Sequence, residues 1–382
     1  MSSEIDYKKE IAKVLKCNPD NIFLYWKGRI ALYAILKAIG VENGDEIILP
    51  AFTCVVVPNA IIYAGAKPIY VDISADTYNM DVNLLEQSIS KKTKAIICQN
   101  TFGLSSNIER VIEIAKKHHI FTIEDCTHGF GGFYNGKPNG SFCDAAFYST
   151  QWNKPFSTGI GGFLVINNSI LLDKIKNLEK TKVKSTAAEK LILSLLLLFK
   201  SLIVNKYTQW FLAQLYRFFS KKNLVVGSNQ GEELSGTKMP ENYFKNISFV
   251  QIWVGKNKLK KIDKVNQIRK KNAEDYTKFL KSNNKAFVDE GLFNNHLFLK
   301  YPLLVKDREK IFKSAKKSNI TLGDWFLSPL HPIKGNLLLW NLDKNLFPVA
   351  SRISEKIVNL PTEILDNKKV INFLKQNIDL VE

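Results

Sequence analysis

The chain has 382 residues, of which 45% are hydrophobic and 24% are charged. These fractions are typical of globular proteins and exclude disordered and fibrous classes. The five cysteines form no CxxC pair, and their odd number argues against a disulfide framework, which fits a reducing cytosol. The five histidines show no HxxxH or HExxH spacing, so no metal site is expected. Because the first ten residues lack the apolar segment of a signal peptide, we expect a cytoplasmic protein.

The net charge is +18, and the excess is unevenly distributed. Residues 181–280 contain 19 basic and 7 acidic residues, which accounts for +12 of the total. An even excess would be compatible with nucleic-acid binding, but clustering beside an apolar run favours another partner. We therefore expect no nucleic-acid partner.

The first 170 residues alternate between helical patterns and short apolar runs. Helices are expected near residues 29–39, 55–64, 83–90 and 107–118, and buried strands at 46–49, 68–71, 95–98, 121–123 and 162–166. Strands that alternate with helices in this way indicate βαβ units and a mostly parallel sheet.

The remaining chain has a different organisation. A long amphipathic helical region covers 243–281, and the last hundred residues combine a strand region at 297–305 with helices near 307–318, 348–359 and 367–377. The sequence thus predicts an α/β fold, with a large domain built on a mostly parallel central sheet and a smaller α+β C-terminal domain. The predicted divisions are a large domain at 1–180, an apolar and basic helical insertion at 181–242, and a third part at 243–382.

Three segments combine residue types that can carry chemistry. Asp125 follows a buried strand, at the edge of the sheet where α/β proteins bind ligands, although a lone Asp there can also cap a helix. Lys154 lies in a polar loop before Gly159, Gly161 and Gly162; it could be a solvated lysine, but the glycines indicate backbone packed closely against something. Gly28 opens a helix whose free N–H groups can bind a phosphate, a weak signal by itself. A lysine, a carboxylate and a phosphate cup are together what pyridoxal phosphate requires.

The sequence resembles the DegT/DnrJ/EryC1/StrS family of sugar aminotransferases, which belong to the fold-type-I pyridoxal-phosphate enzymes. The resemblance covers about 1–180 and 243–382. It is carried, in chain order, by Gly44–Thr53, Ala64–Ile73, Thr93–Ile97, Glu124–Asp125, Gly159–Gly162, Phe347–Ala350 and Leu360–Pro361.

The resemblance implies the role of each site residue. Lys154 would form the Schiff base with the cofactor, and Asp125 would bind the pyridinium nitrogen. The phosphate would contact Ser149 and the backbone N–H groups of Gly28, Arg29 and Ile30. His128 and Gln151 match positions that face the cofactor or lie beside the Schiff base.

The implied reaction is a transamination in two halves, in which glutamate donates an amino group that passes to a keto sugar. The sugar would be nucleotide- or lipid-linked and used for surface polysaccharide, and the enzyme would be a homodimer. Retention of Lys154 argues against the dehydratase branch of the family. Two alternatives stay open: the same cofactor chemistry on a non-sugar carbonyl, and a non-catalytic scaffold that binds a membrane surface or nucleic acid.

Some positions depart from the family pattern and indicate a divergent subgroup. Cys54 replaces the aromatic residue that stacks on the cofactor ring, which leaves Phe52 and Phe102 as candidates. Ile160 stands where relatives have an acid. In relatives an asparagine from the dimer partner completes the phosphate cup; here the stretch 244–248 displaces it, so a lysine or Arg29 is expected to supply the charge instead. In the small lobe Trp325, His331 and Pro332 are candidates for shaping the substrate pocket.

The apolar run that starts at Leu191 has no counterpart in relatives. Lys200 interrupts it after roughly ten residues, too few to span a bilayer. Two interpretations remain. The run is a buried or dimer-covering helix, or residues 189–222 form an amphipathic hairpin in the membrane interface, with aromatic side chains at headgroup depth and basic ones facing anionic lipid. The second interpretation would place the enzyme at the inner face of the membrane.

Overall fold

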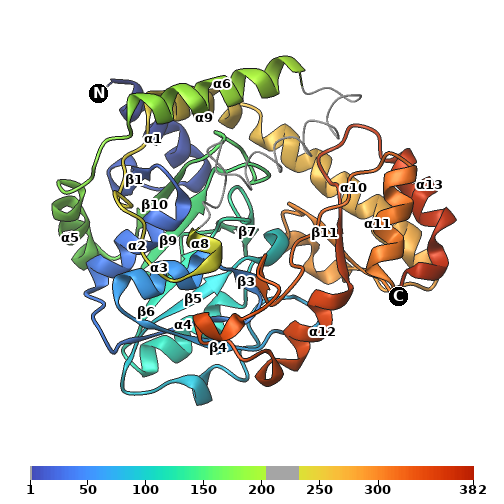
Figure 1. Cartoon of the computed structure of the whole chain (residues 1–382), viewed down its shortest axis with the longest axis horizontal. Coiled ribbons are helices and arrows are strands. Elements are labelled where there is room, and N and C mark those ends of the chain that lie inside the picture. Colours follow the sequence, from blue (N-terminus) through green and yellow to red (C-terminus); the bar gives the residue numbers. More distant parts are fainter. Residues whose placement is uncertain (1, 204–231) are drawn as a thin grey trace.

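The computed structural model of the chain describes residues 2–203 and 232–382. It has two lobes that lie side by side, a large one built on a seven-stranded sheet and a smaller one that contains the C-terminus (Figure 1). This arrangement confirms the predicted α/β fold, with a mostly parallel central sheet in the large lobe.

The central sheet has the strand order β1-β10-β9-β6-β5-β2-β4. The five strands from β9 to β4 are parallel neighbours, whereas β10 is antiparallel to both β9 and β1. The bounds of the strands are β1 Ile22–Tyr25, β2 Glu46–Pro50, β4 Lys67–Val71, β5 Thr93–Gln99, β6 Phe121–Asp125, β9 Ala145–Ser149 and β10 Gly162–Ile166. Because β6, β5 and β9 run the same way, Asp125 and Ser149 end at the same edge of the sheet.

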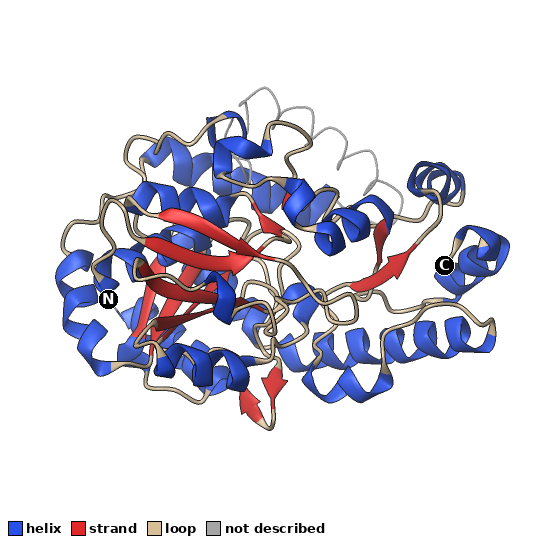
Figure 2. Ribbon diagram, turned by 90° about the horizontal axis from the view of Figure 1, so that it is seen from below, coloured by secondary structure: helices blue, strands red, loops and turns tan. Residues whose placement is uncertain are grey.

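Helices cover both faces of this sheet (Figure 2). Side chains of β2 alternate between the two layers: Ile47 and Leu49 pack in one core cluster, and Ile48 packs in another on the opposite face. The first layer contains α2 Gly28–Ile39, α3 Val56–Ala64 and α5 Ser169–Glu179. The second contains α1 Ser2–Leu15, α4 Ile108–Lys117 and α9 Phe249–Leu259.

The small lobe has its own apolar core. The antiparallel pair β11 Tyr301–Leu304 and β13 Ile357–Leu360 packs against α10 Ile262–Ser282, α11 Arg308–Lys317 and α13 Lys368–Gln376. This confirms a smaller α+β C-terminal unit. Helix α12, Pro348–Lys356, instead buries Ala350 and Ile353 in the first-layer core of the large lobe. The short parallel pair of β3 Thr53–Cys54 with β12 Leu330–His331 joins the lobes, and β7 Phe133–Tyr134 with β8 Lys137–Pro138 forms a small hairpin.

Several local predictions were wrong. The helix expected near 83–90 is reduced to a 3-10 turn at Glu86–Ser88. The helix expected at 348–359 ends at Lys356, because the following buried, β-branched residues pair with β11 as strand β13. The sequence analysis also missed β1 and β9, which are short and carry aromatic residues that do not alternate with polar ones.

The insertion is described only in part. Helix α6, Ala187–Ile203, buries Leu193, while Leu191 and Leu195 are 61% and 55% exposed. Residues 204–222 of the expected hairpin lie outside the described residues, as does the rest of the stretch up to α8, Glu232–Ser235. None of the helices that the structure describes is both long and apolar enough to cross a bilayer. Helix α9, which follows the predicted domain division at residue 242, packs with the core of the large lobe. The division itself stays a prediction.

Candidate active site

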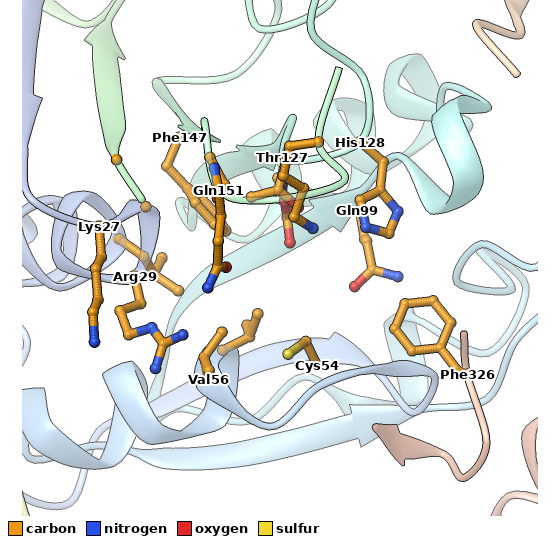
Figure 3. A pocket seen from close by; sticks show the side chains of 17 residues that line it. Lys27, Arg29, Cys54, Val56, Gln99, Thr127, His128, Phe147, Gln151 and Phe326 are labelled. Carbon is orange, nitrogen blue, oxygen red and sulfur yellow. Dashed lines mark hydrogen bonds between the residues drawn. The ribbon is translucent and has the colours of Figure 1, made fainter. Parts of the chain in front are cut away.

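A pocket lies at the end of the parallel strands, between the start of α2, the loop after β9 and a small-lobe segment at Phe326 (Figure 3). Seven of the eight residues expected at the site line it: Gly28, Arg29, Asp125, His128, Ser149, Gln151 and Lys154. Ile30 does not; its side chain is buried in the core beneath α2, and its N–H donates to the Lys27 carbonyl oxygen at 3.1 Å.

The lysine is presented by a tight loop between two antiparallel strands. The Thr150 N–H donates to the Gly161 carbonyl oxygen at 2.9 Å, and the Trp152 N–H donates to the Gly159 carbonyl oxygen at 3.0 Å. Helix α6 covers this loop, since a side chain on Gly159 would come within 2.9 Å of Leu193. The loop glycines are therefore packed closely, as the sequence predicted.

The pKa of Lys154 is lowered to about 8. Burial is the main cause, and repulsion from Arg29 and Lys300 adds to it, while Asp125 acts in the opposite direction. The Lys154 amine lies 4.6 Å from the centre of the Trp325 ring. At pH 7 about a tenth of this amine is therefore unprotonated and able to act as a nucleophile or base, far more than for a solvated lysine.

Strand β6 ends with two acidic residues, Glu124 and Asp125, and of these Asp125 lines the pocket. Its side chain is 3% exposed and accepts a hydrogen bond from the Thr127 N–H at 2.9 Å. Burial raises the pKa of Asp125, an effect opposed by the Thr127 hydrogen bonds and by Lys154. Glu124 has a structural role, because its carboxylate accepts hydrogen bonds from Asn100 and from the Gly140 N–H.

His128 is held as a neutral hydrogen-bond donor. Its Nδ1 accepts a hydrogen bond from the Phe102 N–H at 3.2 Å, so the ring proton resides on Nε2. Burial, together with repulsion from Lys154 and Lys300, lowers the pKa of His128 well below its usual value. Its ring stacks on Trp325 with the centroids 4.7 Å apart and the planes within 4°. The small lobe thus covers this side of the pocket.

The opposite end of the pocket is built on glycine contacts. A side chain on Gly28 would lie 2.8 Å from the Tyr148 carbonyl oxygen and 2.9 Å from the Ser149 Cβ. A side chain on Gly162 would lie 2.3 Å from the Gly28 Cα. The start of α2 can therefore lie directly against Ser149 and β10 only because both positions lack a Cβ.

Some pocket residues were missed by the sequence analysis. Lys27 lines the pocket beside Gly28, and its position next to the helix-opening glycine was the available signal. Phe326 also lines the pocket, whereas the proposed stacking residues Phe52 and Phe102 are fully buried and are not among the lining residues. Cys54 does line it, beside Val56. Among the described residues, no group of three or more His, Cys, Asp or Glu side chains could hold a metal ion.

The chain belongs to the DegT/DnrJ/EryC1/StrS aminotransferase family, whose model matches residues 27–372. GDP-perosamine synthase of Escherichia coli O157:H7 is 43% identical over 147 residues, which are 38% of this chain and 40% of that protein. A UDP-2-acetamido-2-deoxy-3-oxo-D-glucuronate aminotransferase of Pseudomonas aeruginosa is 38% identical over 154 residues, 40% of this chain and 43% of that protein. These matches thus span less than half of each relative.

The fold likeness extends over nearly the whole chain. NtdA of Bacillus subtilis, solved with bound cofactor PMP, superimposes with a TM-score of 0.71 at 20% identity, and the match covers 99% of this chain and 77% of that one. At this identity the likeness establishes the fold alone. The resemblance inferred from the sequence motifs is therefore confirmed at the level of family and fold.

The lowered pKa of Lys154 predicts its reactivity. Raising the pH converts the ammonium ion to the nucleophilic amine, so labelling of Lys154 by an amine-reactive reagent should rise with a midpoint near pH 8. A solvated lysine titrates about two units higher, at about 10.4. The measurement is the extent of labelling of the Lys154 peptide by mass spectrometry between pH 6 and about 11. A midpoint at the solvated value would contradict the buried environment described here.

Proposed function

We propose that the chain is a pyridoxal-phosphate-dependent aminotransferase that transfers an amino group from glutamate to a keto sugar for surface polysaccharide synthesis. The observation that carries this proposal is the convergence of Lys154, Asp125 and His128 on one pocket whose other end is cationic. Family membership supports the class of reaction. The named activities of the E. coli and P. aeruginosa relatives support a nucleotide-linked sugar as acceptor.

The pocket residues fit the cofactor. The Gln151 Nε2 atom is buried without a hydrogen-bond partner and belongs to a residue that lines the pocket, so a ligand with an acceptor oxygen would satisfy it. Ser149, Gly28 and the side chains of Lys27 and Arg29 add donors at the same end. We assign Gly28, Arg29, Ser149 and Gln151 to the phosphate end. Ile30 would contribute only by fixing the first turn of α2.

Each remaining residue has a role that follows from its environment. Bound pyridoxal phosphate supplies an electron sink that acidifies the α-hydrogen of an amino acid. Asp125 offers a buried carboxylate that stabilises positive charge on a ring nitrogen. His128 Nε2–H donates toward an oxygen of the ligand. Lys154, whose pKa is about 8, can hold the cofactor and then take up and return a proton near neutral pH.

The visible absorption spectrum tests this function. Pyridoxal phosphate added to the protein should produce the band of a covalent lysine adduct, and glutamate should remove it. Lys154→Ala should produce no band. Lys300→Ala is the matched control, because the pKa of Lys300 is also lowered to about 8 by burial, yet Lys300 is not among the pocket-lining residues. A missing band in the wild type, or a band that survives in Lys154→Ala, would contradict the proposal.

The assembly is a further part of this proposal. We infer a homodimer that contacts anionic lipid at the inner face of the membrane through the outer surfaces of α6 and α9. Leu191, Leu198, Phe249 and Trp253 are each more than half exposed on these helices, and Lys190 and Lys258 are exposed beside them. Helices α6 and α9 lie next to each other at one edge of the large lobe (Figure 1).

Sedimentation of the purified chain tests both the homodimer and the contact with anionic lipid. Sedimentation velocity should give the mass of a dimer. Vesicles containing anionic lipid should pull down the protein, and Phe249→Ser with Trp253→Ser should reduce binding because the buried apolar area is lost. A monomeric mass would contradict the dimer. Equal binding to neutral and anionic vesicles, or none to either, would contradict the lipid contact.

A further inference from the structure

One end of the pocket carries an unusual concentration of buried positive charge. Lys27 and Arg29 flank Gly28 at the start of α2, and their side chains are 10% and 3% exposed. Both face one carboxylate, Glu233 of α8, which is 1% exposed. The Arg29 Nη1 atom lies 2.5 Å from the Glu233 Oε2 atom, and the Lys27 Nζ atom lies 3.8 Å from it. Among the described residues, two cations thus share this carboxylate.

These cations border the same space as the phosphate-end donors. Lys27 and Arg29 line the pocket together with Ser149 and Gln151. Figure 3 shows them on one side and His128 and Phe326 on the other, with the Gln151 side chain between. Among the described residues that line the pocket, Asp125 carries the one carboxylate, and Glu233 is not a lining residue. An anion at this end would therefore meet a lysine, a guanidinium and the unpaired Gln151 amide.

The two cations respond differently to this environment: Glu233 raises the pKa of Arg29 in spite of its burial, whereas the pKa of Lys27 falls. The pKa of Lys27 is lowered to about 8 by burial and by repulsion from Arg29, which the attraction of Glu233 only partly offsets. A buried charge is costly unless it is paired or bound to a ligand of opposite charge. A dianion placed here would stabilise both side chains, and the N-terminal dipole of α2 would add to the attraction.

Two polar side chains of the stretch 244–248, which displaces the partner's asparagine in the sequence, have hydrogen-bond or ion-pair partners within this chain. Asn246 Oδ1 accepts hydrogen bonds from the Lys182 amine at 3.1 Å and from the Ile247 N–H at 2.9 Å. The neighbouring Lys245 amine pairs with Glu189 at 2.6 Å. Lys27 and Arg29, which line the pocket, are therefore candidates within this chain for the charge that balances a phosphate.

We propose that Lys27 and Arg29 bind a phosphate monoester dianion within one subunit, and that Glu233 is the counter-ion whose hold on them the dianion weakens. This inference rests on the proposed function, because it takes the cofactor's phosphate as the ligand. It assigns to two side chains of this chain the role that the family resemblance gives to an asparagine of the partner.

The test compares pyridoxal phosphate with pyridoxal, which lacks only the phosphate. Dissociation constants are measured by absorbance for the wild type and for Lys27→Met, Glu233→Gln and Lys37→Met. Lys27→Met should weaken pyridoxal phosphate by about tenfold or more, since it removes a charge-assisted contact, and should leave pyridoxal nearly unchanged. Glu233→Gln should tighten pyridoxal phosphate by several-fold. Lys37→Met is the matched control, because it removes an exposed lysine from the same helix and should change neither constant.

Lys27→Met and Glu233→Gln are expected to act in opposite directions, so the test stays decisive if one of them folds poorly, which thermal melts would reveal. Inorganic phosphate should compete with pyridoxal phosphate in the wild type but not with pyridoxal. Equal weakening of both compounds by Lys27→Met would overturn the inference, as would a loss of pyridoxal phosphate binding in Lys245→Met but not in Lys27→Met. A wild-type protein that binds neither compound would instead overturn the proposed function, and this inference with it.

Discussion

The active-site region depends on the close approach of α2 to the strands β9 and β10. Gly28 and Gly162 lie so near each other that a Cβ on either would overlap backbone of its neighbours. That approach brings the first amides of a helix beside Ser149 and beneath the loop that carries Lys154. Every functional group at the cationic end of the pocket takes its position from this contact, because Lys27 and Arg29 immediately flank the glycine.

The electrostatics of the pocket follow from the same geometry. Positive charge gathers where the helix begins, and the buried carboxylate of Asp125 lies at the end of β6. A ligand with a dianionic tail and a cationic ring would thus be oriented by the two ends before any covalent contact. Burial lowers the pKa values of Lys27, Lys154 and Lys300 alike to about 8. The three lysines are therefore equally basic, and the place of each amine relative to the cofactor has to determine which one reacts with it.

Much of this site was predictable because its residues follow strands. Asp125 and Ser149 end parallel strands, and Lys154 lies in the loop between Ser149 and β10, so local patterns suffice to bring them together. Contacts made through space were not predictable in the same way. Glu233 reaches Arg29 across more than half of the chain, and Trp325 comes to His128 from the other lobe. The pairing of Ile357–Leu360 with β11 likewise overrode a helical pattern that looked continuous in the sequence.

The central claim is that Lys154, among several lysines with a lowered pKa, is the one that holds the cofactor. Reduction of the protein–pyridoxal phosphate complex with borohydride, followed by proteolysis and mass spectrometry, identifies the modified lysine directly. We expect a pyridoxyl group on the peptide that contains Lys154 and none on the peptides that contain Lys27 or Lys300. Modification of Lys27 or Lys300 in place of Lys154, or no modified peptide at all, would contradict it.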